Sequence, residues 1–477
     1  MRCRRVLQWL VLGVSGQLAV GLAAGPSDNQ RLIMETRLPV VGQAQLSVMP
    51  VSSTAGDRAG TQPPSGVRVR LSLLAAEAVR SLPLIRSVAA RARGDQEKAE
   101  QARAALRPNA AATLRYQKEL ENSGTTVPFQ NYAGGVQLTI PVYRPQASAN
   151  VDAARLLFES TSAAKIETER DLLAALATAY IGAAQLEQET SSLAAERDGL
   201  IAQRDLNQRR MQGGAGTLVE VLETAARAEL VQALVRGAEG AEKFQLAEVA
   251  RLANAPVMRV MRLGDGTPAL IVPPLADAAL ALARQENTTL TRLRLAADSA
   301  RATVTAQKAG ASPTVDLVGS MDRSRIEFGA VSSQAPSAQV GVRVAVPLFT
   351  GGLIDSRVRE AEAAVERVEA DLQDAELTIR ADVAKAYADL DRAKAQMAAN
   401  NSALAISLTS LKATGKAFDA GVRGNIDVIN AQQQTFSSRR EAMRARAAYL
   451  LAQVRILALT GLLSLDAIKK LEAALTE

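Results

Sequence analysis

The feature that most constrains this chain is a strand pattern that leads directly into an unusually long helical pattern. Every second residue over 340–346 is valine, with glycine, alanine or arginine between, which is the period-two pattern of a strand. Pro347 and the pair Gly351–Gly352 end this strand, and the next Gly or Pro is Gly415. A strand that feeds one very long helix is unusual in a globular domain, and here it occurs twice.

The chain is an internal duplication with a nearly constant offset. The segment 136–143 matches 342–349, and Pro141 and Pro347 lie 206 residues apart. Further pairs keep this offset within one residue: Arg107-Pro108 with Ser312-Pro313, Ala179-Tyr180 with Ala386-Tyr387, and 218–222 with 425–429. The sequence therefore predicts a first repeat over 67–255, a linker over 256–274, a second repeat over 275–461 and a C-terminal tail over 462–477.

Both repeats have the same predicted order: helix, β-window, long helix, glycine-bearing turn, helix. The predicted elements are first helices over 70–106 and 276–309, β-windows over 109–145 and 314–349, long helices over 147–210 and 353–418, and last helices over 218–252 and 425–461. Each window has room for two strands around a loop, which we expect over 120–127 and 329–336.

The long helices carry seven-residue apolar repeats. These are Leu172, Ala179, Leu186, Leu193 and Leu200 in the first, and Val383, Leu390, Met397, Leu404 and Leu411 in the second. A repeat sustained over four heptads without internal caps indicates coiled-coil packing rather than a globular core. At 1.5 Å per residue, each predicted helix is a rod of roughly 95 Å.

The β-windows favour a membrane-spanning β-structure. They contain six of the chain's 14 aromatic residues, and aromatic girdles on short alternating strands are a weak signature of a transmembrane barrel. The alternative is a small soluble β-domain that caps a coiled coil. Four strands cannot close a barrel, because closure needs about eight or more, so a membrane-spanning form of this chain must oligomerise.

The residue inventory argues against an enzyme. The chain has no His, and its one Cys is Cys3. Zinc sites of Cys and His, and catalytic devices that use either residue, are therefore not expected, and no Walker A, GxGxxG or HExxH motif occurs. The formal net charge of +7 comes without a basic patch interleaved with aromatics, so we expect no nucleic acid partner. We expect no cofactor and no metal.

The N-terminal segment is predicted to be a secretory signal peptide over 1–24. Three arginines lie within the first five residues, and a mostly apolar run closes on the small residues Ala23 and Ala24. The alternative is a retained membrane anchor, for which the polar stretch 15–17 is unfavourable. The following segment, 25–66, is rich in Pro, Gly, Ser and Thr and is predicted to be flexible.

The duplicated halves, the strand-to-helix junction 346–352 and the stretch 418–429 resemble the TolC family of outer membrane factors. Within that family the chain is similar to the outer membrane component that exports cyclolysin. The resemblance implies an α+β membrane protein: a homotrimer whose twelve strands form one barrel in outer membrane lipid, continued by a coiled-coil tunnel in the periplasm. It also implies a periplasmic adaptor and an inner membrane ABC transporter, which supply substrate and energy.

The resemblance places a gate where the second repeat's turn enters its last helix. Arg423 occupies the position of the family's gating arginine, Asp427 that of an inward-facing acidic ring, and Glu220 that of the gate's acidic partner. Phe418 stands where many members have Tyr, and Asn430 where some have a second Asp. The alternative is that these charges only favour helix ends, with Glu220 and Asp427 in first turns.

The sequence and the resemblance together predict a passive export channel of a type I secretion system. Its cargo would be an unfolded secreted protein, an RTX-type toxin if the narrower similarity holds. A drug or metal efflux channel of the same build remains an alternative, because none of the predicted pore residues separates the two. A soluble coiled-coil scaffold is an alternative of another class.

Overall fold

The computed structural model describes residues 68–119, 129–264, 271–273, 275–328 and 331–476. These belong to the second of two compact units, 62–477. The predicted signal peptide 1–24, the predicted flexible segment 25–66 and the loop predicted over 120–127 lie outside the described residues.

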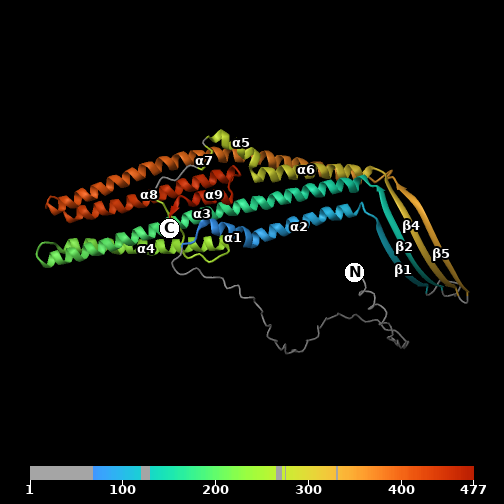
Figure 1. Ribbon diagram of the computed structural model, residues 1–477, viewed down its shortest axis with the longest axis horizontal. Helices are drawn as coiled ribbons and strands as arrows, with labels where there is room; N and C mark the ends of the chain where they lie inside the picture. Colours follow the sequence, from blue (N-terminus) through green and yellow to red (C-terminus); the bar gives the residue numbers. More distant parts are fainter. Residues whose placement is uncertain (1–67, 120–128, 265–270, 274, 329–330, 477) are drawn as a thin grey trace, which may run out of the picture. The chain divides into compact units, whose positions relative to one another are not determined.

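Long helices and one four-stranded sheet make up most of this unit (Figure 1). In chain order the elements are α1 (Leu71–Ser81), α2 (Pro83–Ala104), β1 (Asn109–Glu119), β2 (Phe129–Tyr143), α3 (Pro145–Gln212), α4 (Leu218–Ala253), β3 (Arg262–Leu263), α5 (Ala276–Glu286), α6 (Thr288–Lys308), the 3₁₀ turn η1 (Ala309–Ala311), β4 (Thr314–Phe328), β5 (Val331–Ala345), α7 (Leu353–Asp419), α8 (Asn425–Leu459), α9 (Leu465–Glu472) and β6 (Leu475–Thr476). The predicted long helices are confirmed as α3 and α7, of 68 and 67 residues. No helix within the described ranges is both long and apolar enough to cross a membrane.

The prediction of one continuous first helix in each repeat is wrong. In the first repeat the helix breaks at Leu82, whose ψ of 128° is extended, because Pro83 disfavours a helical residue before it. In the second repeat the break falls at Asn287, whose side-chain oxygen accepts a hydrogen bond from the Leu290 N–H at 3.2 Å and caps α6. The two breaks occupy equivalent positions, so the duplication extends to this detail.

The sheet has the order β1-β2-β4-β5, and all its neighbours are antiparallel. The pairing of β2 with β4 joins the two repeats. The loop predicted over 329–336 is wrong for the most part, because β5 begins at Val331 and continues the ladder with β4. Pro336 fits within β5, since proline is tolerated at the edge of a sheet.

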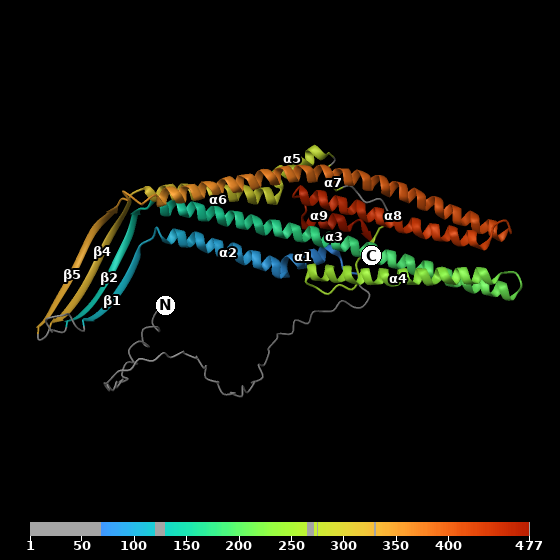
Figure 2. The same cartoon turned by 180° about the vertical axis from the view of Figure 1, so that it is seen from behind.

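The long helices form two hairpins, α3 with α4 and α7 with α8, and α3 also packs against the second repeat. Both views show α3 beside α4 and α7 beside α8, and α3 also packs against α6 and α8 of the second repeat (Figures 1 and 2). Gly214 and Gly421 follow the ends of α3 and α7 with φ of +78° and +74°. These values lie in the left-handed region that favours glycine, so the equivalent glycines allow both helices to turn back.

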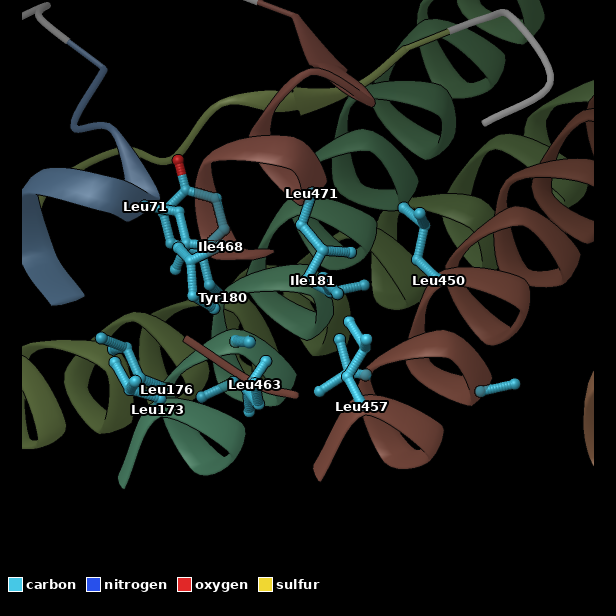
Figure 3. Close-up of a cluster of buried hydrophobic side chains, with 14 of the residues drawn as sticks. Leu71, Leu173, Leu176, Tyr180, Ile181, Leu450, Leu457, Leu463, Ile468 and Leu471 are labelled. Atoms are coloured by element: carbon cyan, nitrogen blue, oxygen red, sulfur yellow. The ribbon is translucent and has the colours of Figure 1, made fainter. Parts of the chain in front are cut away.

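The main apolar core lies where these helices meet the linker and the tail. Leu176, Tyr180 and Ile181 of α3 pack with Leu450 of α8 and Ile468 of α9, and all are at most 2% exposed (Figure 3). Tyr180 donates its hydroxyl proton to the Val69 carbonyl at 2.6 Å and accepts from the Met261 N–H at 2.8 Å.

The linker and the tail contain structure that the sequence analysis did not predict. Strand β3 of the linker pairs with β6 of the tail, and α9 lies between the end of the second repeat and β6. Tyr387, the counterpart of Tyr180, donates to the Pro273 carbonyl of the linker at 2.6 Å. Equivalent tyrosines of the two long helices therefore bind the backbone of the linker, one near its beginning and one near its end.

Candidate gate at the turns and candidate lipid-facing sheet

The turn between α7 and α8 carries Arg423 and Asp427 in one local arrangement. One Asp427 carboxylate oxygen accepts a hydrogen bond from the Gly424 N–H at 3.1 Å, at the first turn of α8. The other lies 3.6 Å from Arg423 Nη1, and the two side chains are 36% and 61% exposed. An exposed pair of this kind contributes little to stability and is easily exchanged for another partner.

Glu220 occupies the corresponding place in the other hairpin. Its carboxylate accepts from the Thr217 N–H at 2.9 Å, and its own N–H donates to the Thr217 hydroxyl at 3.3 Å, which is a complete capping box. Among the described residues, the hydrogen bond of the Glu220 carboxylate is made within this turn. Within one chain, therefore, the structure brings Arg423 to Asp427 and not to Glu220.

Phe418 and Asn430 each contact an arginine of the first repeat. The guanidinium of Arg210, near the end of α3, lies 4.7 Å from the centre of the Phe418 ring, a cation–π contact. Arg227 of α4 donates to the Asn430 side-chain oxygen at 2.8 Å. Sequence reasoning found Phe418 and Asn430 through the resemblance but missed both arginines.

A buried polar network joins the two hairpins close to the turns. Gln203 of α3 donates to the side-chain oxygens of Asn425 at 2.6 Å and of Asn207 at 3.2 Å, and Asn207 donates to the Thr224 hydroxyl at 3.0 Å. Asn207 and Asn425 are 2% and 4% exposed, so their amide groups depend on these partners. The network therefore fixes α8 against α3 through hydrogen bonds.

Two ion pairs continue the contact of α3 with α8 away from the turns. Arg440 pairs with Glu196, both at most 15% exposed, and Arg444 pairs with Glu189. The apolar cluster beside them is small, and its buried members are Leu193, Leu200, Ala228, Val231, Val235 and Ile429. Near the turns, polar contacts therefore account for much of the junction between the hairpins.

The four-stranded sheet has two chemically different faces. Residues opposite each other in the register share a face, and alternate residues of a strand lie on opposite faces. One face carries Leu114, Val136, Leu138, Ile140, Leu317, Met321, Val340, Val342 and Val344. The other carries Asn109, Thr113, Arg115, Gln137, Thr139, Asp316, Ser320, Asp322, Gln339 and Arg343.

The apolar face is strongly exposed in the single chain. Leu114 is 93% exposed, Val340 81% and Met321 70%. A soluble domain rarely leaves so wide an apolar surface in water, and such a surface marks a membrane or protein contact.

Where the sheet meets the helices, Arg144 forms a two-bond ion pair with Asp316 at 2.8 and 2.9 Å, which ties the start of α3 to β4.

The sequence that forms these helices, turns and strands matches a known family. The profile described as Outer membrane efflux protein covers residues 74–255 and 279–462, which is one match in each repeat. The chain belongs to this family. The resemblance predicted from the duplicated halves is confirmed, and membership places the protein in the outer membrane with an extension into the periplasm. The family consists of channel proteins, and enzymes are not known in it.

Individual relatives narrow the comparison. The alkaline protease secretion protein AprF of Pseudomonas aeruginosa is 31% identical over 299 residues, 62% of each chain. Protein CyaE of Bordetella pertussis is 30% identical over 64% of this chain and 66% of its own. The outer membrane protein TolC of Vibrio cholerae is 23% identical over 82% of this chain and 91% of its own. The matches to AprF and CyaE thus span slightly less than two thirds of those relatives.

Solved structures show the same fold. CusC superposes with a TM-score of 0.72 at 13% identity, over 83% of this chain and 92% of that one. The outer membrane protein VceC of Vibrio cholerae gives 0.70 at 18% identity, over 82% and 96%. The fold of the described unit is therefore that of a TolC-like channel protein.

Among the described residues, no group of three or more His, Cys, Asp or Glu side chains is placed to hold a metal ion. The groups gathered at the turns instead form ion pairs, amide hydrogen bonds and one cation–π contact between helices. This chemistry can hold two hairpins together and release them.

Proposed function

We propose that this protein is the outer membrane channel of a type I secretion system and exports an unfolded protein. The observation that carries the proposal is the sheet with one apolar and one polar face, continued by two long helical hairpins. An apolar outer face suits lipid and a polar inner face suits a water-filled passage. The hairpins extend the passage away from the membrane by about 100 Å at 1.5 Å per residue.

The channel requires more than one copy of the chain. Within the chain, β1 and β5 are the sheet's outer strands, each bonded on one side. Four strands are too few to close, and three copies supply a twelve-stranded barrel in which β1 of one copy pairs with β5 of the next. A homotrimer also covers the edges that would otherwise be free to aggregate.

Protein cargo is supported by the relatives. AprF is named for alkaline protease secretion, and a protein of Dickeya chrysanthemi named for secretion of proteases, PrtF, is 25% identical over 62% of this chain. A function in type I secretion implies an inner membrane ABC transporter and a periplasmic adaptor as partners. A toxin of the RTX type is the proposed cargo, following the similarity to CyaE.

Small-molecule efflux is the second candidate. The outer membrane efflux protein BepC of Brucella suis is 24% identical over 70% of this chain and 72% of its own. Deleting the gene separates the two. Loss of a secreted protein from the medium supports secretion, whereas drug or metal sensitivity with normal secretion supports efflux.

We propose that the turns form the gate of this channel. In a trimer the exposed Arg423 and the half-buried Asp427 and Glu220 of neighbouring copies would face one another around a narrow axis. Arg423 would then exchange its partner in the same chain, 3.6 Å away, for a carboxylate of the next copy. A docking adaptor could break such ion pairs with a small change in free energy, as a gate requires.

Conductance in planar bilayers tests channel and gate together. The purified protein should form a pore, and Arg423→Ala should raise its conductance if the arginine holds the turns together. Arg392→Ala is the matched control, because the Arg392–Asp389 pair of α7 has similar exposure, 66% and 38%, and lies away from the turn. A water-soluble monomer without conductance would contradict the channel and favour a soluble scaffold. Equal currents for wild type and Arg423→Ala would contradict the gate alone.

A further inference from the structure

The apolar face of the sheet changes character toward the β-hairpin ends. Leu114, Gly134 and Arg323 lie in one row across the strands, and Tyr116, Tyr132, Arg325 and Gln334 lie in the next row outward. Lys118 follows, opposite Gln130 and in the row of Glu327. Because the helices leave the sheet at its other end, these rows are the farthest of this face from the periplasmic hairpins.

These side chains form a compact group, here named the outer-rim cluster: Tyr116, Lys118, Tyr132, Arg323, Arg325 and Gln334. The two tyrosine rings have centroids 4.9 Å apart. Arg323 Nη2 donates to the Gln334 side-chain oxygen at 2.9 Å, which confirms that these residues share a face. Tyrosines beside cations at the end of an apolar band are typical of the boundary between hydrocarbon and headgroups.

The cluster carries an excess of positive charge. Lys118, Arg323 and Arg325 are countered on this face by Glu327, which lies 2.9 Å from Arg325. The Arg325 and Glu327 side chains are 51% and 34% exposed, so a stronger anion can replace the glutamate with little loss. Paired cations at the level of lipid headgroups favour a phosphate, which guanidinium groups bind with two parallel hydrogen bonds.

The surface around the cluster is hollowed. An open depression of about 660 Å³ is lined by Leu114, Arg115, Tyr116, Tyr132, Ala133, Gly134, Arg323, Arg325 and Gln334. Gly134 keeps it open, since a Cβ there would approach Leu114 Cδ2 to 3.0 Å. The depression continues onto the apolar band, which can accept acyl chains below the polar groups.

We propose that the outer-rim cluster binds the phosphate of an anionic, phosphorylated glycolipid in the outer leaflet of the membrane. Arg323 and Arg325 hold the phosphate, the tyrosine rings support the sugar, and the acyl chains lie along the valine-rich face. This inference rests on the proposed function, because it requires the apolar face of the sheet to meet lipid. It adds a specific lipid contact on the outer surface of the channel, away from its passage.

Lipid binding to the purified full-length protein tests the proposal. The probe is a bisphosphorylated lipid A glycolipid added in detergent, with the dephosphorylated glycolipid as a comparison, and bound lipid is counted by native mass spectrometry. We expect the wild type to prefer the phosphorylated form, and Arg323→Gln/Arg325→Gln to bind it about tenfold more weakly. Arg343→Gln is the control, because Arg343 lies on the polar face of β5, opposite Asp316, and does not line the depression.

Each outcome decides the proposal. Equal binding by wild type and the double variant, or an equal loss in Arg343→Gln, would overturn it, as would full competition by inorganic phosphate. If the double variant does not fold, the single variants Arg323→Gln and Arg325→Gln replace it. Conductance is measured on the same samples: a conducting wild type without lipid preference refutes only the cluster, whereas a non-conducting wild type refutes the channel itself.

Discussion

The helices of the two hairpins pack through apolar side chains in the middle of the unit and mainly through polar side chains near the turns. In the middle of the unit, Leu176, Tyr180 and Ile181 lie in a large apolar core that α1, α9 and both repeats complete. Near the turns, the buried apolar cluster is small, and α3 and α8 meet through the Gln203–Asn425 hydrogen bond and ion pairs. Burial of many apolar side chains contributes a large free energy, whereas each hydrogen bond contributes only about 0.5–1.5 kcal/mol net and can be exchanged for an equivalent partner. From this contrast we expect a fixed middle and a turn end that can rearrange.

Truncation of a core leucine should have the largest effect. Leu176 is fully buried, so Leu176→Ala should lower the free energy of unfolding by about 2–5 kcal/mol, the usual range for such cavities. Leu200→Ala in the small cluster should fall near the lower limit of about 2 kcal/mol, because the site is narrow and can collapse. Denaturant unfolding followed by helical circular dichroism measures both. Equal losses would remove the distinction between the two regions.

Much of the helical architecture could be predicted from the sequence, because it follows from periodicity. The heptad positions Leu172, Leu193 and Val383 are buried as expected, and the glycine turns occur where the offset places them. Pro83 also marked a helix break that the prediction overlooked. The pairs Arg227–Asn430 and Arg210–Phe418 could not be predicted, since they join segments about 200 residues apart without any periodic signal. The two-residue pairing of β3 with β6 is too short to leave a pattern.

The tyrosine pair tests the fixed region more finely. Tyr180→Phe leaves the Met261 N–H and the Val69 carbonyl without their partner, and should lower stability by about 1–3 kcal/mol. Tyr387→Phe removes a single bond, to Pro273, at a less buried site, and should lower it by less. Thermal denaturation of both variants measures the difference. A larger loss for Tyr387→Phe would contradict the asymmetry between the two linker contacts.

Tyr180 also predicts that the protein loses stability at alkaline pH. Burial raises the pKa of Tyr180 above its ordinary value of 10.0, because the phenolate would be desolvated in the core. The stability from its neutral form is therefore complete below pH 10.0 and is lost as the pH rises further. Unfolding measured between about pH 9 and 12 should be less pH-dependent in Tyr180→Phe than in wild type. Identical pH profiles would contradict this assignment.

At the turn end, the coupling free energy between Arg227 and Asn430 should be smaller than the loss expected for Tyr180→Phe. Their hydrogen bond of 2.8 Å joins α4 to α8 at half-exposed positions, for which about 0.5–1.5 kcal/mol is expected. A double-mutant cycle with Arg227→Met and Asn430→Ala measures the coupling in unfolding, and bilayer conductance of the same variants measures its effect on opening. We expect modest coupling and a raised conductance. A coupling near zero would mean that this bond does not hold the hairpins together.

The smallest effect on stability should come from Arg423→Ala. Its pair with Asp427 is exposed and lies within one turn, so the free energy of unfolding should change by no more than about 0.5 kcal/mol. Asp427→Asn should lower stability somewhat more, because Asp427 also accepts the Gly424 N–H and complements the positive helix terminus. If the turn end is a gate, Arg423→Ala should nevertheless change conductance more than Leu176→Ala does. Stability and conductance would then rank the same variants in opposite orders, which a uniformly rigid tunnel could not produce.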